Sequence, residues 1–259
     1  MLFEQPPRLD PDALLASLQD KFPGLARSPA NRSDAAMVFS HAPARDLPMP
    51  PAAMVLGVSA LPEGLEAALQ QTRGWPEARE TVSRARCALP LFDGIATAPQ
   101  PQVRVDVFCG LVLSVLEATQ PCAIYWAPSQ RVLSPSAFMS ALLAGDFDLF
   151  TRAVVNVRSF RTGPDTTLMD TVGLAPFGLP DFECHYRFTD VDANTMALKL
   201  YNYAFEVFRT GDVFRTGHTV DGLVPGDLWP CRRDVARVAP SRTVVRIIAG
   251  SIAVQGEAG

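Results

Sequence analysis

The chain has 259 residues, enough for one large domain or two small ones, and 48% of them are hydrophobic, which is typical of a folded protein. The net charge of −4 argues against nucleic acid as the main partner, because neutralising phosphates requires a basic face. We also expect no secretory leader and no membrane contact, since no uncharged apolar run approaches the roughly 18 residues of a membrane span. The five cysteines are scattered, as in a reducing compartment, so we expect a cytoplasmic protein.

Capping residues and apolar periodicity predict alternating strands and helices in the first part of the chain. Asp10 followed by Pro11 is typical of a helix start, and the apolar stripe beyond it continues to Phe22. The other predicted elements, in chain order, are strands over 37–40 and 54–59, helices over 61–71 and 103–118, a strand over 122–127, and a helix opened by Ser134 and Pro135.

The same logic applies to the second part. Asp190 or Asp192 is expected to cap a long helix that ends near Gly211. The predicted strands are 152–160, 168–174, 182–188, 213–220 and 243–254. Along 182–188, Phe182, Cys184 and Tyr186 should face one side of a sheet and Glu183 and His185 the other.

One motif occurs twice, in residues 81–93 and 171–183. The matching positions are Thr81, Val82, Ala85, Leu89, Pro90, Phe92 and Asp93 against Thr171, Val172, Ala175, Leu179, Pro180, Phe182 and Glu183. Such a repeat predicts two related halves that bury their apolar faces against each other. We therefore predict an α+β fold of two split β-α-β (ferredoxin-like) halves forming an α/β sandwich, in which residues 81–126 and 171–215 share a strand–helix–strand path.

This pattern suggests four segments. They are an N-terminal helix and loop (1–35), a first α+β half (36–145), a second α+β half (146–223) and an Arg- and Pro-rich C-terminal segment (224–259).

Residues 108–223 resemble a bacterial family known as domain of unknown function 4261. The segments that carry the resemblance begin at Ala123-Ile124-Tyr125-Trp126, at Thr171-Val172-Gly173-Leu174 and at Gly211-Asp212-Val213-Phe214. The resemblance implies a bacterial cytosolic protein and brings no established activity. Some members of the family lie near secretion or toxin–immunity clusters, such as those of type VI secretion.

Glu183, His185 and His218 are the candidate metal ligands. Two histidines and a carboxylate suit zinc with an open fourth position. Their spacing is not diagnostic, and the first half has no equivalent set, so we favour a solvated polar face and expect neither a metal nor a cofactor.

Other chemistry is less supported. Asp190 to Asn194 begins like a calcium loop, but Thr195 stands at the turn-glycine position, which favours helix capping. A nucleophile at Cys184, Cys122, Ser129 or Ser134 would need a base, and the chain has three histidines and no G-x-S-x-G elbow.

The C-terminal segment is locally basic through Arg232, Arg233, Arg237, Arg242 and Arg246, which predicts either a docking surface for an acidic protein or an ordinary solvated edge. Trp229, beside Pro230 in a stretch that resembles a loop, is the tryptophan expected near a surface contact.

The leading hypothesis is a non-enzymatic cytosolic interaction protein, accessory to or conferring immunity in a bacterial secretion or toxin system. Its predicted partner-binding residues are Trp229, Arg232, Arg233 and Arg237. The alternative is a small metal-dependent enzyme that uses Glu183, His185 and His218. The sequence leaves the oligomeric state open.

Overall fold

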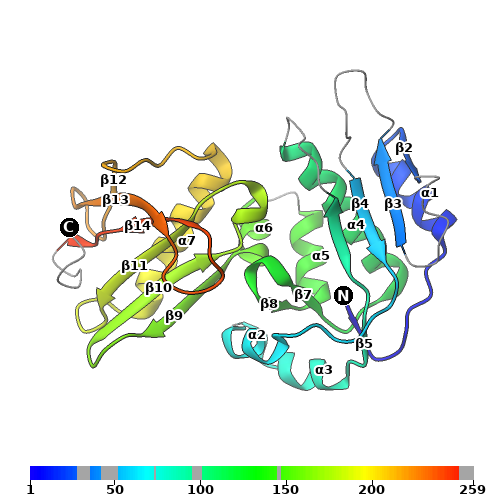
Figure 1. Ribbon diagram of the computed structural model, residues 1–259, viewed down its shortest axis with the longest axis horizontal. Helices are drawn as coiled ribbons and strands as arrows, with labels where there is room; N and C mark the ends of the chain where they lie inside the picture. The colour runs from blue at the N-terminus through cyan, green and yellow to red at the C-terminus, as the bar shows by residue number, and fades with distance from the viewer. Residues whose placement is uncertain (28–35, 42–51, 73, 95–100, 145–146, 251–259) are drawn as a thin grey trace. The chain divides into compact units, whose positions relative to one another are not determined.

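The computed structural model describes residues 1–27, 36–41, 52–72, 74–94, 101–144 and 147–250 (Figure 1). Residue contacts divide the chain into two units. The first comprises residues 1–125 and 132–144, and the second comprises residues 126–131 and 145–259. The ends of the predicted segments 1–35 and 224–259 lie outside the described residues, as do positions 251–254 of the last predicted strand.

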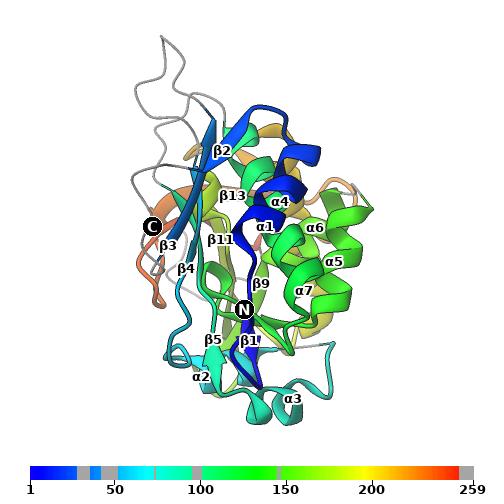
Figure 2. The same cartoon turned by 90° about the vertical axis from the view of Figure 1, so that its right-hand side faces the viewer.

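The first unit contains a four-stranded antiparallel sheet in the order β2-β3-β4-β6. The strands are β2 (Leu25–Arg27), β3 (Ala36–His41), β4 (Ala52–Leu56) and β6 (Leu91–Gly94). Helices α1 (Pro11–Lys21) and α4 (Pro101–Thr119) pack against this sheet and against each other, as Figure 2 shows. The sheet buries Phe39 and Val55, and α4 buries Val112 and Leu116, so the core of the unit lies between these two layers.

Shorter elements complete the first unit. They are β1 (Leu2–Phe3), paired with β5 (Cys87–Ala88), and the helices α2 (Leu65–Gln71), α3 (Ala78–Arg84) and α5 (Pro135–Leu143). A small apolar cluster that includes Leu2, Val82 and Ala123 lies among them. The hairpin of β7 (Ile124–Trp126) and β8 (Arg131–Leu133) encloses a 3-10 turn, η1 (Ala127–Ser129), and the division between the units falls within it.

The second unit contains a six-stranded sheet in the order β12-β13-β14-β11-β10-β9. Its strands are β9 (Asn156–Arg161), β10 (Thr166–Val172), β11 (Asp181–Arg187), β12 (Thr219–Asp221), β13 (Leu228–Val235) and β14 (Thr243–Ile247). Neighbouring strands are antiparallel, except that β11 and β14 are parallel. A 3-10 turn, η2 (Ala175–Phe177), connects β10 to β11.

Helix α7 (Ala193–Thr210) covers one face of this second sheet, and α6 (Phe147–Val154) packs beside it. Asp192 caps α7 by accepting hydrogen bonds from the backbone N–H groups of Asn194 and Thr195, as predicted. Leu200, Tyr203 and Val207 are buried as expected for the inward stripe of α7.

The structure confirms the α+β class, but the ferredoxin-like organisation of the halves is not confirmed. Thr81 and Val82 lie in helix α3, whereas Thr171 and Val172 lie in strand β10, so the predicted common backbone path is wrong for this part of the motif. The later part agrees, because Pro90 leads directly into β6 and Pro180 directly into β11. What the units share is three antiparallel strands that are neighbours in the sheet, followed by a long helix, namely β3, β4, β6 and α4 in one and β9, β10, β11 and α7 in the other.

Two strand predictions are also corrected. The predicted strand 152–160 begins as helix α6 and becomes extended only from Asn156. The predicted strand 213–220 is a turn region until Thr219. Within the described ranges, no helix combines the length and apolar character that crossing a membrane requires.

Candidate functional site

Strand β11 presents the two faces expected from its sequence. Phe182, Cys184 and Tyr186 are fully buried, and the Phe182 ring lies 5.6 Å from that of Tyr203 on α7. Glu183 and His185 therefore point to the opposite face. The expectation of a solvated face is wrong for Glu183, whose side chain is 0% exposed.

The three candidate metal ligands are engaged in different contacts. Glu183 accepts a hydrogen bond from Nε of Arg246 at 2.8 Å, and the His185 ring lies 2.9 Å from the hydroxyl of Thr162 and 3.3 Å from the guanidinium of Arg237. His218 lies in an exposed turn, where its carbonyl accepts from the backbone N–H of Cys231. Among the residues that the structure describes, no three His, Cys, Asp or Glu side chains are grouped so that they could hold a metal ion.

The charged residues opposite α7 form a row across the sheet. Strand register pairs Arg158 with Asp170, Asp170 with Glu183, Glu183 with Arg246, and Arg246 with Arg232. Because directly opposed residues on neighbouring strands share a face, the five strands from β9 to β13 in the sheet order each contribute one charged side chain to this row.

Four side chains of this row and two neighbours that pair with each other form what we call the ionic cluster: Arg158, Asp170, Glu183 and Arg246, with Asp181 and Arg242. All six side chains are at most 6% exposed.

Asp170 lies at the centre of the ionic cluster. Arg158 donates to both of its oxygens, at 3.0 and 2.6 Å, and Arg242 donates a third hydrogen bond at 2.7 Å. Arg242 also donates from Nε to Asp181 at 3.1 Å. Each carboxylate thereby accepts hydrogen bonds from a planar guanidinium. These charge-assisted hydrogen bonds offset the free energy that a buried ion pair loses when it is removed from water.

The connection from β13 to β14, residues 236–242, lies against the ionic cluster (orange to red in Figure 1). The backbone N–H of Arg237 donates to Glu183 at 2.9 Å, and the carbonyl of Ala239 accepts from Arg158 at 2.9 Å. The carbonyls of Val238 and Pro240 accept from Arg242. The cluster therefore anchors a segment that has no regular secondary structure of its own.

Asp181 is a carboxyl group of the ionic cluster whose pKa is shifted by its surroundings. Burial raises its pKa to about 6, and this effect outweighs the guanidinium of Arg242 and the hydroxyl of Thr171, both of which favour the ionised form. The Thr171 hydroxyl donates to Asp181 at 3.0 Å and accepts from the backbone N–H of Phe182 at 2.8 Å. Because the hydrogen bonds of Asp181 are made to other groups of the protein, Asp181 serves to stabilise the fold around it.

The predicted basic surface is wrong for two of its five arginines, since Arg242 and Arg246 are buried in the ionic cluster. Arg232 and Arg233 are half-buried and pair with Asp234 and Asp212, while Arg237 is exposed.

The expected surface position of Trp229 is also wrong. It lies within β13 rather than in a loop, and its side chain is 1% exposed.

The turn between β12 and β13 bears the exposed apolar side chains of this region. We call residues 222–228 the hairpin tip. Its apolar side chains and their exposed fractions are Leu223 (36%), Val224 (63%) and Leu228 (57%). The backbone N–H of Gly222 donates to the carbonyl of Asp227 at 2.6 Å, which closes the turn. The hairpin tip thus presents apolar side chains outward on a hydrogen-bonded turn flanked by Asp221 and Asp227.

Sequence reasoning missed Arg158, Asp170 and Asp181. The available signal was a charged residue inside an apolar strand pattern, as at Asp170 between Met169 and Val172. A charge at such a position indicates a buried partner.

Residues 170–248 match the model of the family described as domain of unknown function DUF4261. The predicted resemblance is thereby confirmed, although its first segment, around Ala123, lies outside the matched range. The match runs from β10 through β14 and includes every residue of the ionic cluster except Arg158. No curated protein and no solved structure matches the chain.

Proposed function

We propose that this protein acts by binding another protein and catalyses no reaction itself. The observation that carries the proposal is the hairpin tip, where Leu223, Val224 and Leu228 are exposed on a closed turn. Apolar side chains held on an ordered surface gain free energy when a partner removes them from water. The flanking carboxylates of Asp221 and Asp227 favour a partner whose apolar hollow has a basic rim.

The ionic cluster supports the same proposal. The carboxylates of Asp170, Asp181 and Glu183 are held by arginines of the same sheet and its connection, so they act in positioning strands. The alternative, a small metal-dependent enzyme at Glu183, His185 and His218, would require Glu183 to exchange Arg246 for a metal. Metal analysis of the purified protein, with a His185→Ala variant as control, tests this alternative: stoichiometric metal that is lost in the variant would favour it.

The cellular setting is part of the proposal. The partner would be a cytoplasmic component of a bacterial secretion or toxin system, in which this protein serves as an accessory or immunity factor. This setting comes from the family resemblance and is independent of the hairpin tip.

The test uses the full chain as bait in an extract of its source cells. Val224→Asp should reduce capture of a stoichiometric partner at least ten-fold. Leu143→Asp is a matched control, because Leu143 on α5 is also 63% exposed. Equal capture by wild type and Val224→Asp, or equal losses in both variants, would contradict a role for the hairpin tip.

A further inference from the structure

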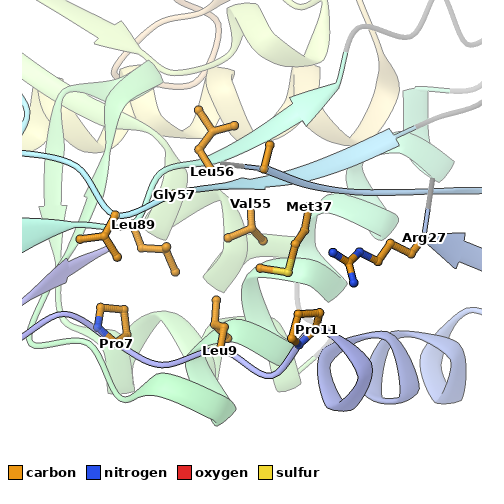
Figure 3. A pocket seen from close by; sticks show the side chains of 11 residues that line it. Pro7, Leu9, Pro11, Arg27, Met37, Val55, Leu56, Gly57 and Leu89 are labelled. Atoms are coloured by element: carbon orange, nitrogen blue, oxygen red, sulfur yellow. The ribbon is translucent and has the colours of Figure 1, made fainter. Parts of the chain in front are cut away.

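A hollow of about 240 Å³ lies within the first unit, between the segment leading into α1 and the strands β2, β3 and β4 (Figure 3). Pro7, Leu9 and Pro11 line it on one side, and Met37 and Val55 line it on the other. Pockets for drug-sized ligands usually measure about 300–1,000 Å³, so this hollow suits a smaller molecule.

Arg27 is the charged residue in the lining. It pairs with Phe39 across β2 and β3, and Met37 pairs with Val55 across β3 and β4. Since paired residues share a face, and Phe39 and Val55 are fully buried, Arg27 belongs to the apolar face of this sheet. An apolar residue would be expected at this position from strand alternation.

The guanidinium of Arg27 has neither a hydrogen-bond acceptor nor an ion-pair partner in the described part of the chain, and its side chain is half-buried. Figure 3 shows it reaching from β2 towards the space between Met37 and Pro11. By contrast, Arg158, Arg242 and Arg246 in the second unit each have a carboxylate partner. A partly desolvated cation without a counter-charge is unfavourable, so an anion that reached it would gain a charge-assisted contact.

We propose that this hollow binds a small amphipathic anion, namely a medium-chain linear carboxylate. Its carboxylate would accept two parallel hydrogen bonds from Arg27, because the planar guanidinium matches carboxylate geometry. Its hydrocarbon tail would lie among Leu9, Met37 and Val55, where apolar surface is removed from water. This site is independent of the hairpin tip and of the proposed protein partner.

The test is calorimetric titration of the full chain with linear carboxylates of increasing length and with the matching alcohols. Affinity should rise about four-fold for each added methylene until the hollow is filled. Arg27→Gln should weaken carboxylate binding at least ten-fold, as expected for a lost hydrogen bond to a charged group, and leave alcohol binding unchanged. Arg8→Gln is the matched control, because Arg8 lies between Pro7 and Leu9 and is exposed.

Leu9→Trp provides a second variant that fills the hollow without altering charge, and it should abolish binding of carboxylates and alcohols alike. Three results would overturn the proposal. They are no binding at millimolar concentration for any length, affinity that is independent of length, and equal losses in Arg27→Gln and Arg8→Gln. If Arg27→Gln does not fold, unaltered binding by Leu9→Trp would overturn the proposal.

Discussion

Replacing Asp170 with Asn should destabilise the second unit strongly. The change keeps the size of the side chain and replaces a negatively charged carboxylate with a neutral amide. That carboxylate accepts two hydrogen bonds from Arg158 and one from Arg242. Both guanidinium groups belong to side chains only 4% exposed, so water cannot replace the lost carboxylate. Removing one partner of a buried ion pair costs about 3–5 kcal/mol. This is a large part of the roughly 5–15 kcal/mol that stabilises a typical domain.

The measurement is urea unfolding followed by tryptophan fluorescence. Two of the three tryptophans, Trp126 and Trp229, belong to the second unit and report on it. Asp190→Asn is the control, because Asp190 pairs with Arg187 on the surface at 2.8 Å, and such pairs contribute at most about 1 kcal/mol. A loss for Asp170→Asn no larger than that of the control would refute the view that the ionic cluster is a structural anchor.

Three further predictions concern the second unit. Tyr186→Phe should leave the free energy of unfolding unchanged or raise it by up to about 2 kcal/mol, because the buried Tyr186 hydroxyl has no hydrogen-bond partner in the described residues. Tyr203→Phe should lower the free energy of unfolding by about 1 kcal/mol, because the Tyr203 hydroxyl donates to a backbone carbonyl at 2.5 Å. A loss of thermal stability in Tyr186→Phe, or a gain in Tyr203→Phe, would contradict this reasoning. The pKa of Asp181 is raised by burial to about 6, so the folded state binds the proton more tightly than the unfolded state, and the contribution of Asp181 to stability should fall by up to roughly 3 kcal/mol between pH 4 and pH 6. The advantage of wild type over Asp181→Asn should thus be larger at pH 4.5 than at pH 7.5, and the reverse order would show that ion pairing outweighs burial. Leu200→Ala should cost about 2–5 kcal/mol in chemical unfolding, whereas Leu198→Ala, at a position 53% exposed, should change stability by less than about 0.5 kcal/mol; similar effects would mean that α7 packs differently.

Local sequence was sufficient for the elements whose ends and faces depend on neighbouring residues. Asp10 and Asp192 accept hydrogen bonds from N–H groups two and three residues ahead, so the helix starts could be predicted from the residue type alone. The long helix predicted over 103–118 is observed as α4, because its apolar periodicity persists over several turns. The alternation along β11 likewise followed from the two-residue period of a strand.

The repeated motif is a case in which local sequence did not determine secondary structure. Thr81-Val82 and Thr171-Val172 are identical pairs, yet the first is helical and the second extended. Val82 packs in the apolar cluster with Leu2, while Val172 lies in the second sheet. Their conformation was therefore decided by tertiary contacts, which outweigh the small intrinsic preferences of single residues.

The charged side chains depended most on the tertiary structure. The sequence places Arg242 and Arg246 in a basic segment, but their carboxylate partners within the ionic cluster lie 61 to 72 residues earlier in the chain. Strand order brings β11 and β14 together as parallel neighbours, and only this pairing turns an apparent basic surface into a buried ionic cluster. Composition and periodicity determined that the chain folds into α+β units with buried helix faces. The three-dimensional fold decided which charges are buried and paired, because a charge is stabilised by groups near it in space and not in sequence. It also placed Arg27 at an apolar hollow, with no partner among the residues that the structure describes.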